Sequence, residues 1–337
     1  MLFVTQLING LQLGSIYALV ALGYSMVYGI IKLLNFAHGD IIMVGGYIAI
    51  FSITHGNFPP IVAALLTVAG CTLLAVIIEK LAYTPLRGTP RLFALLSDAL
   101  ERLANKMHGA SLRPTLPVII LRKLAQSLIR GAAPRLSLLI TAIGISILLQ
   151  NLAQLFFGAG GVPFPGHILL PVGNIVVGGA QIAGTSLITI AVSVASMIAL
   201  ALLVQKTKLG KAMRAVSEDM DASQLMGINV NRIITFTFAV GAALAGVGAL
   251  LYGVRFPLIG PTIGMTLGLY AFVAAVFGGI GSIPGSMLGG YAIGLLQVFV
   301  TAVGLSGWVD GVVFLVLILI LMVRPTGLMG RPMMEKV

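Results

Sequence analysis

Long apolar runs separated by polar loops are the feature that most constrains how this chain can fold. A helix that crosses a membrane needs about 20 mostly apolar residues. Candidate spans fall at Leu7–Ile30, Ile41–Thr54, Ile61–Ile78, Leu136–Phe157, Ser186–Val204, Ile233–Val254, Met265–Gly279, Met287–Val303 and Val309–Val323. Some are short for a full crossing, so we expect eight to ten spans, with nine as the working count. The sequence therefore predicts an all-α, polytopic transmembrane helix bundle that forms one domain over residues 1–337.

Charged residues are too scarce for a water-soluble protein. Hydrophobic residues make up 58% of the chain and charged residues only 9%, whereas a soluble domain carries about 25% charged residues. The net charge of +11 could indicate nucleic-acid binding. However, the basic residues are confined to a few loops between the apolar runs, which is typical of membrane topology and argues against a nucleic-acid partner.

The basic residues also predict the orientation of the chain. All Lys and Arg residues except Arg255 lie at Lys32 or in the segments 80–135, 206–232 and 324–337. Cytoplasmic loops carry an excess of Lys and Arg. Nine spans with the N-terminus outside would place all four regions in the cytoplasm, together with the C-terminus.

Motifs of the common enzyme classes are absent from the sequence. It contains no His-Glu-x-x-His zinc motif, no Gly-x-Ser-x-Gly serine elbow and no P-loop, and one cysteine with four scattered histidines does not make a typical zinc site. We therefore predict no catalytic residue and no metal site. An intramembrane hydrolase remains an alternative, because ionisable residues inside a membrane are functional by default.

The segment LLNFAHGD concentrates polar residues between the first two spans. It contains Asn35, His38, Gly39 and Asp40. In one interpretation Gly39 breaks the first helical run and Asp40 caps the next helix, because a carboxylate accepts hydrogen bonds from free N–H groups at a helix start. In the other, a broken helix lies deeper in the membrane, with Asn35 and Asp40 bordering a transport path.

Two further loops have recognisable local patterns. FGGIGSIPG contains Gly278, Gly279, Gly281 and Pro284, and it predicts a tight cytoplasmic turn in which Pro284 begins the next helix. In the loop 206–232, helix propensity extends from Lys211 to Met226, and Gly227 stands in the C-cap place. Such a helix could dock a cytoplasmic partner or lie on anionic lipid.

Five motifs, in order along the chain, resemble the membrane permease subunits of ABC importers of the branched-chain amino acid class. They are LNFAHGDIIMVGGY, LLITAIGISILLQN, GKAMRAVSEDMDASQLMGINVNRI, AFVAAVFGGIGSIPGSMLGG and MVRPTGLMG. The resemblance covers nearly the whole chain outside one inserted segment. It is greatest for the H-type subunit of the high-affinity leucine/isoleucine/valine system.

The resemblance implies a transport subunit, not an enzyme, in a bacterial inner membrane. The expected partners are a second related permease, two cytoplasmic ATPase subunits, a periplasmic substrate-binding protein and membrane lipid. No cofactor is expected on this chain, because ATP-Mg would bind the ATPases. Urea or a short-chain amide is an alternative substrate to leucine, isoleucine or valine. A self-contained secondary transporter or channel is an alternative mechanism.

The resemblance also implies a role for the loop 206–232 as the cytoplasmic coupling loop. Its coupling helix would be Ala215–Gly227, with Glu218 in the acidic place of the motif. Small residues would permit close approach to an ATPase. The expected docking residues are Ala215, Glu218, Asp219, Ala222, Ser223 and Gly227.

The chain departs from the family pattern in two respects. An insertion at 92–134 reads as amphipathic and basic helices on the inner leaflet, with a regulatory docking site or a disordered tether as alternatives. In addition, the family often has an acid near the position of Gln297 and a lysine near that of Tyr270, and both are uncharged here. This difference leaves the substrate less certain than the transporter class.

Overall fold

The computed structural model of the chain describes residues 2–32, 35–88, 133–177 and 180–330. The predicted insertion at 92–134 lies outside the described residues, apart from its last two positions. Its membrane-surface, docking and tether interpretations therefore stay predictions.

Helices dominate the described chain, and each predicted span coincides with one of them. They are α1 (Leu2–Ile31), α2 (Ala37–Thr54), α3 (Pro60–Ile78), α7 (Ala133–Phe157), α9 (Gly184–Lys206), α12 (Val230–Arg255), α13 (Ile263–Gly278), α14 (Ile283–Ala302) and α15 (Val309–Val323). Within the described residues, 8 helical segments are long and apolar enough to cross a membrane, and α13 is a shorter apolar helix. The prediction of a polytopic helical bundle is confirmed.

Short elements connect these helices. They are the π-helical turn η1 (Glu79–Tyr83), α4 (Thr84–Gly88), α8 (Gly166–Leu169), α10 (Lys208–Glu218), α11 (Met220–Leu225), the 3-10 turn η2 (Ser306–Trp308) and the strands β1 (Val162–Pro163), β2 (Asn174–Val177), β3 (Ala180–Ala183) and β4 (Leu258–Ile259). Strands β2 and β3 form an antiparallel hairpin, and β1 also pairs with β4 in antiparallel orientation.

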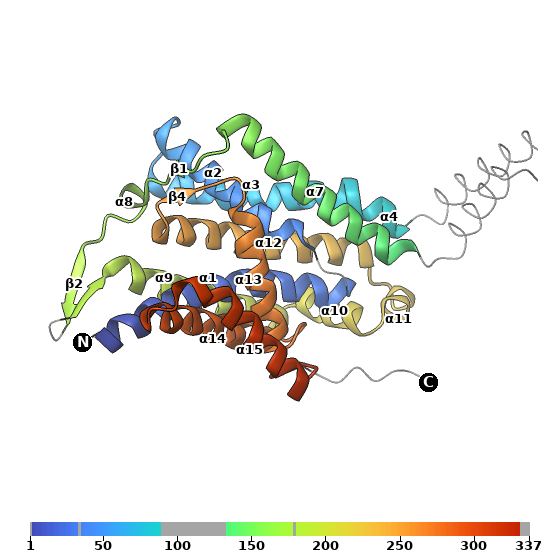
Figure 1. The fold of residues 1–337 in the computed structure, drawn as a ribbon. Helices are drawn as coiled ribbons and strands as arrows, with labels where there is room; N and C mark the ends of the chain where they lie inside the picture. Colours follow the sequence, from blue (N-terminus) through green and yellow to red (C-terminus); the bar gives the residue numbers. More distant parts are fainter. Residues whose placement is uncertain (1, 33–34, 89–132, 178–179, 331–337) are drawn as a thin grey trace, which may run out of the picture.

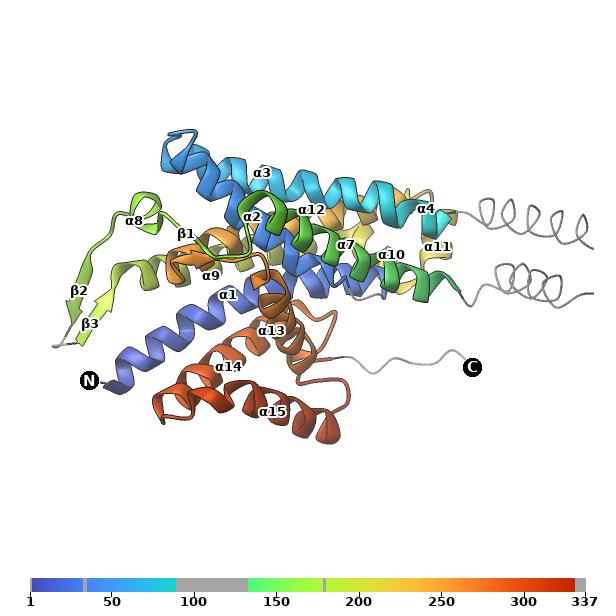
Figure 2. The same ribbon diagram turned by 45° about the horizontal axis from the view of Figure 1, so that its top comes forward.

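Helix α1 lies in the middle of the bundle, and α7 and α15 lie on its outside (Figures 1 and 2). Buried residues make up 83% of the most apolar window of α1 and 78% of that of α2, but only 17% for α7 and 11% for α15. The exposed side chains of the outer helices are large and apolar, as at Leu65, Leu155 and Leu319. This distribution is expected when lipid covers the outer helices, because lipid tails impose no cost on apolar side chains.

The connecting elements lie at two opposite ends of the bundle (Figure 1). The N-terminus, α8 and the β2–β3 hairpin lie at one end, which we call the hairpin end. Helices α4, α10 and α11 lie at the other, together with the last residues of α15. We call it the basic end, because Lys80, Arg214, Arg232 and Arg324 belong to these segments or to their neighbours.

Glycines bring helix α1 into backbone contact with α14. A Cβ atom added to Gly14 would lie 2.7 Å from the Cα of Tyr291, and one added to Gly290 would lie 2.6 Å from the Cβ of Ala18 and closer still to its backbone. Small residues let membrane helices approach this closely, and close packing is a main source of their association energy. Gly14 and Gly290 thus belong to a packing seam between α1 and α14.

Adding a methyl group to this seam should destabilise the bundle. For Gly290→Ala we expect a loss of about 1–3 kcal/mol, because the rigid backbone of α1 cannot move aside. The melting temperature of the purified protein in detergent should fall by several degrees. Gly144→Ala is the matched control, because nothing lies within 4 Å of the position its Cβ would take. A drop as large in Gly144→Ala as in Gly290→Ala would contradict this assignment.

Candidate functional site

The break between α1 and α2 lies well inside the bundle. The ring of His38 packs edge-on against Tyr24 of α1, with centroids 4.9 Å apart, and a Cβ on Gly23 would lie 2.7 Å from His38 Cε1. Gly23 precedes the end of α1 at Ile31 by eight residues, which at 1.5 Å per residue is about 12 Å along the helix. The first turn of α2 therefore packs about 12 Å inside the end of α1.

The predicted structural roles of Gly39 and Asp40 are wrong. Helix α2 already begins at Ala37, and its N-cap residue Phe36 makes no side-chain cap hydrogen bond. Gly39 lies inside the helix, where a Cβ would come within 2.9 Å of the Cα of Gly268 and would overlap the backbone of Gly264. The small size of Gly39 therefore allows α2 to pack closely against α13. The helix break lies earlier in the chain, after α1, where Lys32 has a φ of 56°.

His38 and Asp40 point to different neighbours. His38 faces α1 and α12, where Gly241 lies beside its ring. Asp40 is fully buried, and its Oδ1 accepts a hydrogen bond from the side-chain amide of Gln150 in α7 (3.0 Å). The two side chains therefore do not form an acid–histidine pair, and the described residues include no group of three or more His, Cys, Asp or Glu suited to a metal ion.

Asn35 ties the break to the end of α3. Its buried side-chain oxygen accepts from the hydroxyl of Tyr83 (2.8 Å) in the π-helical turn η1. In the same turn, the buried carboxylate of Glu79 accepts from Thr84 (2.7 Å) and from Thr235 of α12 (2.8 Å). Sequence reasoning missed this network, although an acid at the end of an apolar run was a signal for it.

The predicted single helix from Lys211 to Met226 is wrong, because Asp219 divides it. The backbone of Asp219 is extended, with φ −154° and ψ 112°. Its carboxylate accepts from the N–H groups of Asp221 and Ala222, both at 3.0 Å, and so caps α11. Gly227 follows α11 with a φ of 83°, the left-handed conformation of a glycine C-cap.

The predicted docking residues divide into exposed and buried groups. Ala215, Glu218 and Ala222 are exposed, whereas Ser223 is only 5% exposed and cannot belong to an open surface, which corrects its predicted role. The most exposed apolar side chains of the loop, Leu225 at 89% and Met226 at 83%, were not predicted. They stand out only once the break at Asp219 fixes which side of α11 faces outward.

The glycine-rich turn between α13 and α14 lies at the basic end and is held from two sides. Gly279 has a φ of 108°, which other residues rarely adopt, and Gly281 donates its N–H to the hydroxyl of Ser25 in α1 (2.9 Å). Pro284 lies in the first turn of α14. The N–H groups of Leu328 and Met329 bind the carbonyls of Phe277 and Gly278, both at 2.9 Å, so the segment after α15 closes over the turn.

The two uncharged positions that depart from the family pattern lie in hydrogen-bonded contacts between helices. Gln297 of α14 is buried and accepts from the hydroxyl of Tyr17 in α1 (2.7 Å). Tyr270 of α13 donates to Asp310 of α15, and its ring lies 5.5 Å from that of Tyr17. These groups connect four helices through hydrogen bonds and ring packing.

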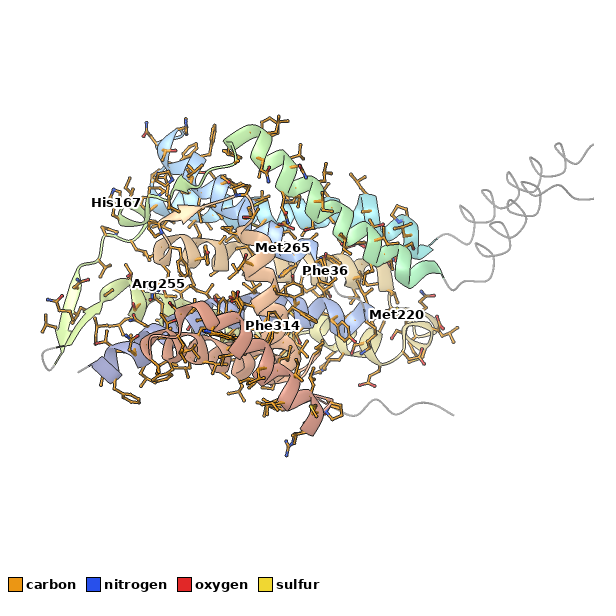
Figure 3. All side chains as sticks on the ribbon, in the orientation of Figure 1. Phe36, His167, Met220, Arg255, Met265 and Phe314 are labelled. Carbon is orange, nitrogen blue, oxygen red and sulfur yellow. The ribbon has the colours of Figure 1, made fainter. Side chains whose placement is uncertain are left out.

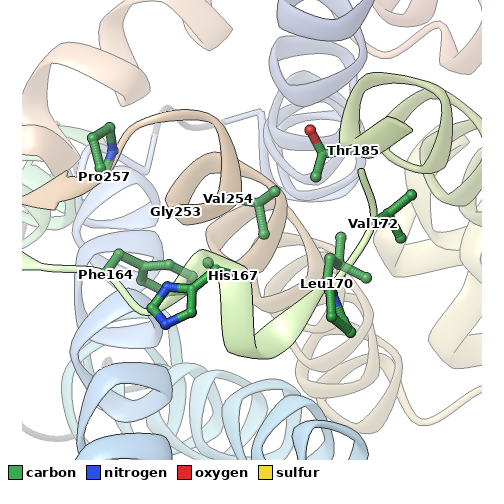
Figure 4. A pocket seen from close by; sticks show the side chains of 10 residues that line it. Phe164, His167, Leu170, Val172, Thr185, Gly253, Val254 and Pro257 are labelled. Atoms are coloured by element: carbon green, nitrogen blue, oxygen red, sulfur yellow. The ribbon is translucent and has the colours of Figure 1, made fainter. Parts of the chain in front are cut away.

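A hollow of about 400 Å³ opens at the hairpin end (Figure 4). Its wall comes from α8, the start of α9 and the end of α12. The lining residues are Phe164, Gly166, His167, Leu170, Pro171, Val172, Thr185, Gly253, Val254 and Pro257. The hollow is mainly apolar and lies away from the helix break.

Comparison with known proteins gives one consistent family. The family model described as the permease component of branched-chain amino acid transport systems matches residues 6–322. The chain is 39% identical to the high-affinity branched-chain amino acid transport system permease protein BraD of Pseudomonas aeruginosa, over 99% of this chain and 98% of that protein. It is 37% identical to LivH of Escherichia coli, described in the same words, with the same coverage. No solved structure matches.

The cap at Asp219 generates a prediction about α11. Asp219→Ala should remove the two hydrogen bonds to the backbone and destabilise this helix by about 1 kcal/mol. Hydrogen exchange of the amides in residues 220–226 should then accelerate about fivefold, because a loss of that size changes an opening equilibrium by that factor. Asp219→Asn should retain slow exchange, since asparagine also caps helices. Equal exchange in the two variants would count against the cap.

Proposed function

The chain belongs to the family of permease components of branched-chain amino acid transport systems, and from this we infer that it is the membrane-spanning subunit of an ATP-driven ABC importer. Its substrates are leucine, isoleucine, valine or related amino acids. The full-length similarity to BraD and LivH is the observation that carries this proposal. The helical bundle with an internal helix break supports it, because transporters place substrate sites at such breaks.

The importer needs subunits that this chain does not supply. We propose a second, related permease, two cytoplasmic ATPases and a periplasmic binding protein as partners. The sequence has no P-loop, which is consistent with ATP-Mg binding on separate subunits. In this arrangement the two permeases enclose the path, and the ATPases drive its alternation between outward and inward openings.

The distribution of charge supports one orientation in the bacterial inner membrane. Apart from Arg255, the Lys and Arg residues that the structure describes belong to segments at the basic end, which we place in the cytoplasm. The C-terminus then lies in the cytoplasm, and the N-terminus, α8 and the β2–β3 hairpin face the periplasm. The hairpin end is accordingly the side that meets a binding protein.

Helices α10 and α11 are the proposed docking element for an ATPase subunit. Met213 and Val216 of α10 are buried within the bundle, whereas Leu209 in its first turn is 46% exposed, so most of the apolar face of this helix is turned toward the bundle and not toward lipid. Leu225 and Met226 instead extend from α11 at the basic end, where they are almost fully exposed. Exposed apolar side chains on a polar segment are typical of a protein contact.

Uptake by the complete complex tests the proposed function. The two permeases and two ATPases, reconstituted in proteoliposomes with the loaded binding protein outside, should accumulate labelled leucine when ATP is enclosed. Omission of ATP or of the ATPases should abolish accumulation. Accumulation of leucine by this chain alone would instead favour the secondary-transporter alternative, and accumulation of labelled urea but not leucine would overturn the proposed substrate.

Removing the apolar side chains of α11 should weaken ATPase docking. We expect Leu225→Ser with Met226→Ser to reduce co-purification of the ATPase subunits by about tenfold or more, because central apolar anchors each contribute over 1 kcal/mol to an interface. Gln224→Ser is the control, since this neighbouring residue is polar and exposed. Membrane insertion should be unchanged in both. Undiminished co-purification in the double variant would show that the ATPase docks elsewhere.

A further inference from the structure

Asp40 is a carboxylate buried inside the bundle, and no Lys or Arg among the described residues forms an ion pair with it. Its side chain is 0% exposed, and it lies in the first turn of α2 near the depth of Gly23 in α1. Gln150 donates to Oδ1, but Oδ2 has no hydrogen-bond partner in the described part of the chain. An acid at this depth is costly and is retained in membrane proteins mainly for function.

The N-terminus of α13 meets this carboxylate. A Cβ added to Gly264, in the first turn of α13, would lie 2.5 Å from Asp40 Oδ1 and 2.7 Å from its Cα. Helix α13 has 16 residues, or about 24 Å, and is too short to cross the hydrocarbon core of about 30 Å. It therefore begins inside the bundle, where its first N–H groups carry partial positive charge.

One face at this place is open. Thr262, Met265, Thr266 and Leu269 are exposed and recur at the spacing of one helix face, and Met265 is 67% exposed. Figure 3 places Met265 and Phe36 on the same side of the molecule, between α7 and α15. The N–H groups of Ile263 and Met265 donate to the carbonyls of Gly260 and Thr262. The non-helical backbone that precedes α13 is tolerated at this depth where it borders protein or water, which favours a water-lined face here.

We propose that Asp40 and the first turn of α13 form the site in the transport path that binds the amino and carboxyl groups of the substrate. Asp40 Oδ2 accepts from the substrate ammonium, and the partial positive charge at the start of α13 attracts its carboxylate. Half-buried Gln150 connects Asp40 to the α7 side of this site. This assignment rests on the proposed function, and it goes further by naming residues that bind the substrate in the transport path.

This pairing matches what the proposed substrates share. Leucine, isoleucine and valine differ in their apolar side chains but have the same ammonium and carboxylate groups. A site that places the Asp40 carboxylate and the positive start of α13 at fixed positions can therefore bind all three amino acids. Asp40 is covered in this structure, so the substrate reaches it when α7 and α13 separate during alternating access.

A charge-removing variant separates this role from a structural one. Asp40→Asn retains the acceptor for Gln150 but cannot pair with an ammonium group, and leucine uptake by the reconstituted complex should fall about tenfold or more, the effect of losing a charged partner. Complex assembly and ATPase stimulation by the loaded binding protein should persist. Asp310→Asn is the control, because it removes a charge from an exposed acid of α15 while its amide oxygen can still accept from Tyr270. Normal uptake by Asp40→Asn would overturn the proposal.

Thiol labelling tests the open face without altering Asp40. Cys71, the single cysteine, is buried, so Cys71→Ser provides a background for Met265→Cys and Thr266→Cys. A water-soluble cationic methanethiosulfonate should label both positions in the complex. It should label them faster than Leu65→Cys and Ile198→Cys, which are similarly exposed but lie on the outer helices α3 and α9.

The outcomes identify which proposal fails. Loaded binding protein with ATP should change the labelling rate at positions 265 and 266, because the path opens and closes during the cycle. Labelling no faster than at the controls would overturn the placement of the path at α13. If the wild-type complex takes up no leucine, the proposed function itself fails. Wild-type uptake together with normal uptake by Asp40→Asn refutes only the site.

Discussion

Direct contact between helix backbones is the interaction on which the rest of this bundle depends. Where α2 meets α13, Gly39 and Gly264 remove the side chains that would hold the helices apart. That closeness lets two helices begin inside the bundle and still cover much of each other's polar backbone. With side chains at these glycines, the starts of α2 and α13 would separate and expose N–H groups to lipid, at a cost of several kcal/mol each.

The sequence identifies the helices well because the bilayer imposes a minimum apolar length. It predicts a break between the first two spans but places it at Gly39, inside α2, and not before Ala37. It also does not give the depth of the break, because the contact of His38 with Tyr24 and Gly23 comes from tertiary packing. Helix propensity likewise gives one helix across Asp219, where the carboxylate instead caps a new one. The burial of Ser223 could not be foreseen, since the packing of α11 against α10 and α12 decides which side faces inward.

The π-helical turn η1 connects the helix break to the basic end. An extra residue in that turn rotates Glu79 and Tyr83 so that one reaches Thr235 and the other reaches Asn35. Helix α12, which carries Thr235, also packs against α10. A movement of α10 and α11 can therefore be transmitted through α12 and η1 to the start of α2. The two hydrogen bonds that connect these elements are Thr235 to Glu79 and Tyr83 to Asn35. π-turns of this kind often occur at functional sites.

The segment after α15 has a practical consequence for handling the protein. Leu328 and Met329 satisfy the last carbonyl groups of α13, and Gly327 lies against Gly279, so these residues complete the turn although they are distant from it in sequence. An affinity tag is therefore best attached beyond residue 330. A fusion partner joined directly to Val323 would leave the end of α13 uncovered and would alter the subunit it was meant to report on.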